Sequence, residues 1–276
     1  MATVPSTVGL PSSVMEVTAE RFRALARSSP WRWSTLRFVS WRRPDRGRFD
    51  DGVRAWLQRP DRLRVEDLDG DLIQVVREEH PRSVGVLTLG RSKRSLRRTL
   101  LLPSEVTPEI GTDGLVRARP SDWEVDDDDP MFQSYTWVAL LDPVELADGD
   151  DDGPATTFED LRAVEHHGRE AWEATVRPTS SYTPRCSCCA LLLSEESERR
   201  LADEGGPTLR SREPDFVFSD AHRVRFDVQT GVCVHVEQFG GDRDGWCEDV
   251  MIEAVDEPMG EELFTQPRRS RFQLGR

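Results

Sequence analysis

The sequence lacks any apolar run approaching the roughly 18 residues that a transmembrane helix needs, so no membrane-spanning segment is predicted. Residues 1–30 also lack the apolar stretch, roughly 7–15 residues long, that marks a secretory signal. We therefore expect a cytoplasmic location. If the true start lay upstream, a signal would precede this stretch and the location would be extracytoplasmic.

Cysteine is scarce, and its five copies are an odd number, which fits reduced thiols better than a disulfide framework. The sequence has no Gly-x-Ser-x-Gly elbow, Walker loop, dinucleotide fingerprint or His-Glu-x-x-His pair. Without a nucleophile–base pair or a cofactor motif, we expect a protein that is not an enzyme and needs no cofactor.

Positive charge is in deficit, and the net charge of −14 argues against a nucleic-acid partner. The basic residues gather in residues 21–100, and the remainder is strongly acidic. The acidic runs Asp126–Asp129 and Asp148–Asp152 indicate an alternative function, a regulatory interaction module whose acidic face meets a basic protein partner.

What the sequence does contain is alternation of apolar and charged residues. Across Ala221–Asp227, Val224 and Phe226 alternate with charged residues, and the pattern returns over Val232–Glu237. This period of two is typical of half-buried strands. Between the two stretches, Gly231 supplies the backbone freedom that a tight turn needs, so a hairpin is predicted.

The same reasoning along the chain predicts an α+β fold: a large curved antiparallel sheet, or half-barrel, with an N-terminal helix and one or two short helices covering it. The helix is expected to start at Ser13, which with Glu16 forms a capping box. Further strands are expected at 31–41, 53–59, 62–67, 72–77, 84–89, 161–166, 169–177 and 250–255, and a strand or short helix at 135–141.

One β-rich domain is expected over residues 13–265, between a loose tail at 1–12 and a C-terminal tail at 266–276. Residues 103–134 are rich in Pro, Asp and Gly. They are expected to form a long mobile crossing, because loops of this length inside a domain are usually functional or disordered.

Three segments, Val53–Val65 with the Asp69-Gly70 turn, Gly168–Trp172 and Arg225–Gly231, resemble the strands of the outer-membrane lipoprotein carrier (lipoprotein-sorting-like) superfamily, including its actinobacterial branch. The resemblance covers roughly residues 14–90 and 158–255. It implies a curved sheet around an apolar cavity that holds acyl chains or docks a partner.

The predicted function is accordingly that of a non-enzymatic binding protein. Its apolar cavity would take a lipid-like small molecule or a segment of a partner protein, and burial of apolar surface would drive binding. The eight tryptophans could instead simply fill the core. The residues expected to line the cavity are Trp33, Trp56, Val65, Trp172, Phe226 and Val234.

Two short motifs raise the possibility of a metal. Cys186, Cys188 and Cys189 place three thiols within four residues, which makes them weak candidates for zinc and a metal-dependent protein the third functional hypothesis. Small buried packing residues are the alternative. The stretch from 148 to 159 matches the calcium-loop pattern, with carboxylates at Asp148, Asp150, Asp152 and Glu159.

His166 and His167 fall at the expected tip of a hairpin. Two adjacent histidines can bind a metal ion or titrate near neutral pH. Side chains at a hairpin tip are normally solvated, so we expect these two rings to be exposed to water.

Overall fold

The computed structural model describes residues 16–44, 46–77, 101–120, 128–149 and 153–266. The N-terminal and middle elements are α1 (Ala19–Ser28), η1 (Ser29–Trp31), β1 (Thr35–Arg43), β2 (Val53–Gln58), β3 (Arg62–Asp67), β4 (Leu72–Arg77), η2 (Pro103–Glu105), β5 (Glu109–Ile110), β6 (Val116–Ala118), α2 (Thr136–Leu141) and η3 (Val144–Leu146). The C-terminal elements are β7 (Thr156–His166), β8 (Arg169–Pro178), η4 (Ser187–Cys189), α3 (Glu195–Asp203), α4 (Leu209–Arg212), β9 (Ala221–Asp227), β10 (Cys233–Phe239), β11 (Cys247–Val255) and η5 (Glu261–Phe264).

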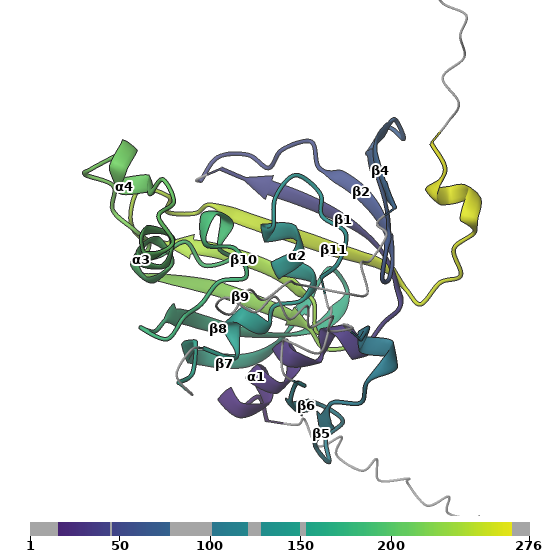
Figure 1. The fold of residues 1–276 in the computed structure, drawn as a ribbon, viewed down its shortest axis with the longest axis horizontal. Coiled ribbons are helices and arrows are strands. Elements are labelled where there is room, and N and C mark those ends of the chain that lie inside the picture. The colour runs from purple at the N-terminus through teal and green to yellow at the C-terminus, as the bar shows by residue number, and fades with distance from the viewer. Residues whose placement is uncertain (1–15, 45, 78–100, 121–127, 150–152, 267–276) are drawn as a thin grey trace, which may run out of the picture.

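Nine of these strands form one curved antiparallel sheet in the order β4-β3-β2-β1-β11-β10-β9-β8-β7 (Figure 1). An N-terminal meander and a C-terminal meander join where β1 pairs with β11, from Leu36 opposite Val255 to Arg43 opposite Cys247. The sheet does not close, because β4 and β7 stand at its two edges. The predicted fold class, α+β with a large curved antiparallel sheet, is confirmed.

Helices α1 and α2 lie against the inner face of the sheet (Figure 1). Phe22 of α1 is fully buried, and its ring centroid lies 4.4 Å from that of Phe226 in β9. Every residue of α2 is buried, and its Trp137 ring lies 5.0 Å from Phe38 of β1. The alternating apolar residues of the strands therefore have a packed partner layer, which is what holds an open sheet in water.

The predicted β9–β10 hairpin is present, and its turn fixes α1. Asp227 accepts hydrogen bonds from the backbone N–H and the hydroxyl of Thr230, both at 2.8 Å. Gly231 has φ +74°, a conformation that side chains disfavour. A Cβ there would lie 2.8 Å from the carbonyl oxygen of Leu25 in α1. The turn thus sits directly against the helix backbone.

Several sequence expectations need correction. The cap of α1 is Thr18, whose hydroxyl accepts from the N–H of Arg21 at 3.3 Å, and not Ser13, which lies outside the described residues. Trp31 belongs to a 3₁₀ turn, so the strand expected from residue 31 begins at Thr35. Of the two alternatives predicted for residues 135–141, the structure has the short helix, α2, at Thr136–Leu141. The strand expected at 84–89 lies outside the described residues.

The crossing at 103–134 is partly ordered structure. Its described residues include η2 and the two-stranded sheet of β5 and β6, which packs against α1. Val116 is buried, and its N–H donates to the hydroxyl of Ser28 at 2.9 Å. Within the described residues, none of the helices combines the length and apolar character needed to cross a membrane.

Candidate functional site

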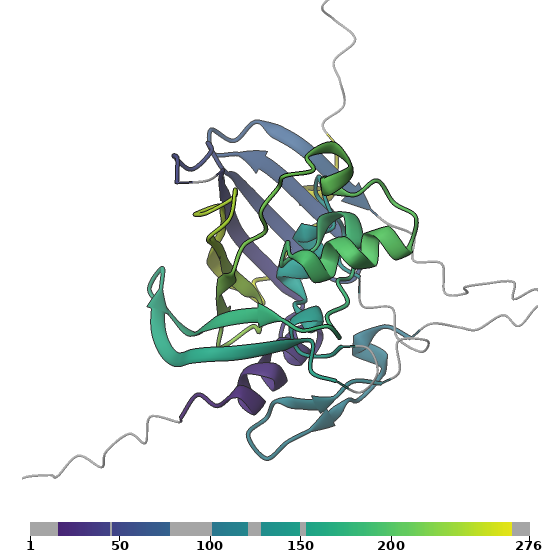
Figure 2. The ribbon, with the colours of Figure 1, turned by 90° about the vertical axis from the view of Figure 1, so that its left-hand side faces the viewer.

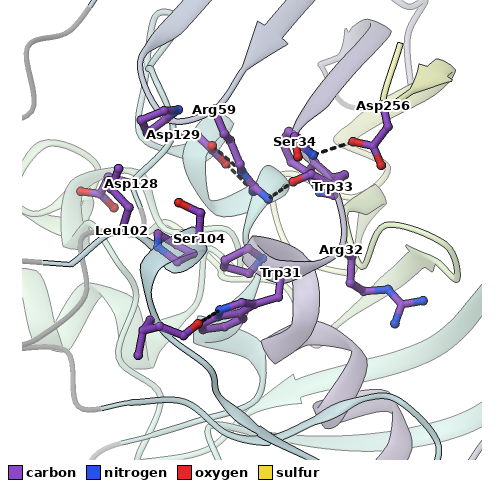
Figure 3. Close-up of a pocket in the computed structure, with 14 residues that line it drawn as sticks. Trp31, Arg32, Trp33, Ser34, Arg59, Leu102, Ser104, Asp128, Asp129 and Asp256 are labelled. Carbon is purple, nitrogen blue, oxygen red and sulfur yellow. Dashed lines mark hydrogen bonds and ion pairs between the residues drawn. The ribbon is translucent and has the colours of Figure 1, made fainter. Parts of the chain in front are cut away.

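A pocket with a volume of about 410 Å³ lies where the chain passes from η1 into β1. Five separate segments contribute to its walls, which are apolar on one side and charged on the other (Figure 3). The lining residues are Pro30, Trp31, Arg32, Trp33, Ser34, Arg59, Pro60, Leu102, Pro103, Ser104, Val106, Asp128, Asp129 and Asp256.

Arg59, which follows β2, organises the floor of the pocket (Figure 3). Its guanidinium donates two hydrogen bonds of 2.7 Å to the carboxylate of Asp129 and a third, of 2.8 Å, to the carbonyl of Ser29. The guanidinium carbon also lies 3.3 Å from the ring centroid of Trp33, a cation–π contact. A forked donor held on both sides loses little freedom when a ligand arrives, so the floor is preorganised.

Trp31 forms the apolar wall. Its indole N–H donates to the carbonyl oxygen of Val106 at 3.1 Å, which ties η1 to the segment after η2 (Figure 3). The ring is only half-buried, so one part of it remains available. An indole fixed at its polar end and open along its body is suited to apolar contact with a ligand.

The rim of the pocket is acidic. Arg59 is matched by Asp129, and Arg32 turns away to donate to the carbonyls of Val228 and Gln229. Asp128 and Asp256 remain on the rim, the first paired with Arg185 and the second accepting the N–H of Ser34 at 2.7 Å. Both residues are exposed, but Arg185 neutralises Asp128, so Asp256 is the rim carboxylate that favours a positive group.

Five of the six residues predicted to line a cavity are buried in the core. These five residues do not line a common pocket. Val65, Trp172, Phe226 and Val234 pack in the core with α1, and Trp33 is buried but also lines the pocket. Trp56 alternates with the core residues on either side of it, so it points to the opposite face of the sheet. A ligand cavity inside the sheet stays a prediction, and Trp56 cannot belong to it.

The sequence did single out Trp33, but it missed Arg59 and Asp129. These two are 70 positions apart, and no local pattern links them. The one usable signal is the Trp31-Arg32-Trp33 run immediately after the helix-ending Pro30. A Trp side chain is suited to a pocket wall, because its ring is apolar and its N–H takes a hydrogen-bond partner.

The three neighbouring cysteines do converge. Cys186 Sγ lies 3.0 Å from Cys188 Sγ, and Cys188 Sγ lies 3.8 Å from Cys189 Sγ. Burial raises the pKa of the Cys189 thiol to about 12, and its contacts with Cys186 act in the same direction. A bound metal ion deprotonates the thiols that coordinate it, so this pKa does not decide the question and zinc binding here stays a prediction.

The calcium-loop candidates are only partly described, since Asp150 and Asp152 lie outside the described residues. Asp148 is bound by the guanidinium of Arg27, and Glu159 lies on β7 facing Arg177 at 3.8 Å. A strand therefore follows the loop where an EF-hand requires a helix. The helix–loop–helix context that the motif needs is absent from the described residues.

No family model matches this chain, and no curated protein matches it. Among solved structures, it is similar to MucB, with 12% identity and a TM-score of 0.33 over 91% of this chain. The chain spans about 63% of the length of MucB. It is also similar to a LolA-superfamily protein from Nitrosomonas europaea, with 8% identity and a TM-score of 0.24 over 91% of this chain and 99% of the other.

Both likenesses have TM-scores below 0.5 and do not show a family for this chain. Membership of the lipoprotein carrier superfamily therefore stays a prediction, and a functional conclusion has to rest on the geometry of the pocket.

Proposed function

We propose that the protein is a non-enzymatic binding protein, and that its ligand occupies the pocket beside Trp31. The observation that carries the proposal is a preorganised hollow of about 410 Å³ with an open indole on one wall. This volume falls within the range of roughly 300–1,000 Å³ that is usual for small-molecule sites. The cytoplasmic location remains a prediction from the sequence.

The chemistry of the pocket favours an amphiphile with a cationic head. Its apolar body would cover Trp31, Leu102 and Val106, and its positive group would face the exposed carboxylate of Asp256. The chain's net charge of −14 adds long-range attraction for cations. A single-chain amphiphile suits the pocket better than a lipid with two acyl chains, and an apolar protein segment carrying Lys or Arg would satisfy the same contacts.

The test is a titration of the protein, followed by tryptophan fluorescence and calorimetry, with decyltrimethylammonium and with decanoate below their micelle concentrations. We expect the cationic probe to bind about tenfold more tightly, a difference of about 1.4 kcal/mol. Added salt should narrow the gap because it screens exposed charges. Tighter binding of decanoate would contradict the acidic-rim argument, and binding of neither probe would contradict the function.

Variants locate the ligand. Trp31→Ala should weaken binding of the cationic probe by about tenfold, because it removes the largest open apolar surface of the pocket. Trp246→Ala is the matched control, since Trp246 is also half-buried but lines a different pocket. Equal affinities for both variants and the unaltered protein would place the ligand elsewhere.

The alternative, an acidic face for a basic protein partner, is less favoured by the described residues. Asp128, Asp129 and Asp148 are paired with arginines of the same chain. The other acidic residues of the two runs, Asp126, Asp127 and 150–152, lie outside the described residues.

A further inference from the structure

Three of the chain's five histidines gather on the outer face of the sheet, far from the α1 side. His235 of β10 is the cross-strand neighbour of Asp249 in β11, and Cys247 lies two residues before Asp249 on the same face. Val236 and Val250, which alternate with them, belong to the inner core. The period of two in the strands therefore presents a thiol, an imidazole and a carboxylate side by side.

The tip of the β7–β8 hairpin completes the group. In the sheet, β7 is four strands away from β11, yet His166 Nε2 lies 3.1 Å from the carbonyl oxygen of Val250. His167 Nε2 lies 2.6 Å from Asp249 Oδ2. The tip is therefore folded over the outer face, and Figure 2 shows the bend of this hairpin at the left of the view. The expectation of two solvated histidines is wrong for His166, which is buried.

The donor atoms lie at distances suited to one metal ion. Those of His235, Cys247 and Asp249 are all within 4.8 Å of one another. His166, His167 and Asp249 form a second group of this kind, separate from the first. Cys247 Sγ lies 3.7 Å from His235 Nδ1. Zn–N and Zn–S bonds of about 2.05 and 2.3 Å place two such ligand atoms about 3.6 Å apart around a tetrahedral ion. This pair needs almost no movement.

The carboxylate must move slightly. His235 Nδ1 and Asp249 Oδ1 are 2.7 Å apart, because the imidazole N–H donates to the carboxylate. Around a tetrahedral zinc ion, nitrogen and oxygen ligands lie about 3.4 Å apart. An ion that replaced the shared proton would therefore open this contact by about 0.7 Å, which a turn of the Asp249 side chain provides.

The second nitrogen of His235 faces another carboxylate. With Nδ1 donating to Asp249, His235 Nε2 is buried and has no hydrogen-bond partner among the described residues. Glu237 Oε2 lies 3.8 Å from His235 Nε2, and the Glu237 carboxylate forms ion pairs with Arg43 and Arg223. A metal on Nδ1 would move the proton to Nε2, aimed at Glu237. A carboxylate behind a metal-bound imidazole is the usual outer partner of such a ligand.

His166 has a different role. Arg225 can only donate, so His166 Nδ1 accepts its hydrogen bond at 3.2 Å and Nε2 carries the proton to the carbonyl of Val250. Both nitrogens are thus occupied, and His166 positions the hairpin instead of binding the ion. The positive charge of Arg225 is neutralised by Glu173, to which it donates a hydrogen bond of 2.6 Å.

We infer that His235, Cys247 and Asp249 form a binding site for a zinc-like divalent metal ion, with water as the fourth ligand and His167 as the hydrogen-bond partner of the Asp249 carboxylate. Nitrogen, sulfur and oxygen together suit zinc, which accepts all three. A thiolate and a carboxylate also balance the two positive charges of the ion. The occupied site would hold the β7–β8 hairpin against β10 and β11, independently of the ligand pocket.

The test is titration of the full chain with Co²⁺ and Zn²⁺. We expect a single metal ion per chain, a thiolate-to-cobalt charge-transfer band, visible bands of a tetrahedral ion, and loss of the cobalt spectrum on addition of Zn²⁺. Cys247→Ser should abolish the charge-transfer band. Glu237→Gln should weaken binding by about tenfold or more, because it removes the outer partner of His235.

The matched control is the triple variant Cys186→Ser, Cys188→Ser, Cys189→Ser, which removes the competing thiol cluster and should keep the band. Loss of the band in this variant and its retention in Cys247→Ser would move the metal to the other cluster and overturn the inference. So would the absence of stoichiometric binding. If Cys247→Ser fails to fold, His167→Gln on the half-exposed tip replaces it and should weaken binding by about tenfold.

Discussion

At the scale of single residues, the tightest point of the fold is the contact between the β9–β10 turn and α1. Gly231 combines a positive φ with a Cβ position 2.8 Å from the carbonyl oxygen of Leu25 and 3.2 Å from the amide nitrogen of Ser29. Both neighbours are backbone atoms, which cannot rotate away as a side chain would. Glycine is therefore needed here for two reasons, conformation and space.

Gly231→Ala should lower the free energy of unfolding by about 2–3 kcal/mol, measured by urea denaturation. Gly205→Ala is the control, since Gly205 has a similar φ of +76° and nothing within 4 Å of its Cβ position. It should cost only about 1 kcal/mol, the conformational part alone. Equal decreases in the free energy of unfolding for the two variants would show that α1 shifts to accommodate the added Cβ and that the close contact does not affect stability.

A second residue-scale contrast concerns two aspartates. Asp142 is fully buried and accepts hydrogen bonds from Arg119 and Arg185, whose side chains are themselves nearly buried. Burial alone would raise the pKa of Asp142, but the two guanidiniums hold it below its usual value. Asp148 also binds an arginine, Arg27, but its side chain is 46% exposed.

Asp142→Asn should cost about 3–5 kcal/mol in the free energy of unfolding, because it leaves two buried guanidiniums without their shared charge. Asp148→Asn should cost less than about 1 kcal/mol, since water replaces an exposed partner. Chemical denaturation of the two variants gives both values. Similar losses would mean that burial does not separate the two ion pairs.

At the scale of elements, the strands could be predicted because apolar and polar residues alternate along a half-buried strand. β2, β3, β4 and β8 lie within a residue or so of their expected ranges.

The errors occur where tertiary contacts override local pattern. Trp31 continues an aromatic run that reads as a strand, but its indole is held by Val106, on a segment about 75 positions away. Residues 137–141 are apolar throughout, so their sequence could not distinguish a buried strand from a buried helix. The bent β7–β8 tip, which buries His166, depends on contacts with β11 that no local rule describes.

At the scale of the whole molecule, both candidate sites are assembled from distant segments. The pocket joins residues near 30, 59, 103, 129 and 256, and the histidine cluster joins β7, β10 and β11. The sequence could predict which residue types lie on each face of the sheet, because alternate residues of a strand point to opposite faces. It could not supply the register between β10 and β11, on which the pairing of His235 with Asp249 depends.

Stability of the whole molecule should depend on pH through His222, a fully buried residue of β9. Burial lowers its pKa from 6.5 to about 4, because the charged ring would lose its hydration. As the pH falls below 6.5, the unfolded chain takes up a proton at this site and the folded chain does not. The free energy of unfolding therefore decreases between pH 6.5 and 4 and then levels off.

The expected loss from this residue is about 2 kcal/mol between pH 7.5 and 5. Other groups titrate in the same interval, so the measurement compares urea unfolding of the unaltered protein and of His222→Gln at both pH values, with a chelator present. The variant lacks only the titrating group of His222. Between pH 7.5 and 5, its free energy of unfolding should therefore decrease by about 2 kcal/mol less than that of the unaltered protein. Parallel pH profiles for the two proteins would show that His222 is protonated at no cost inside the fold.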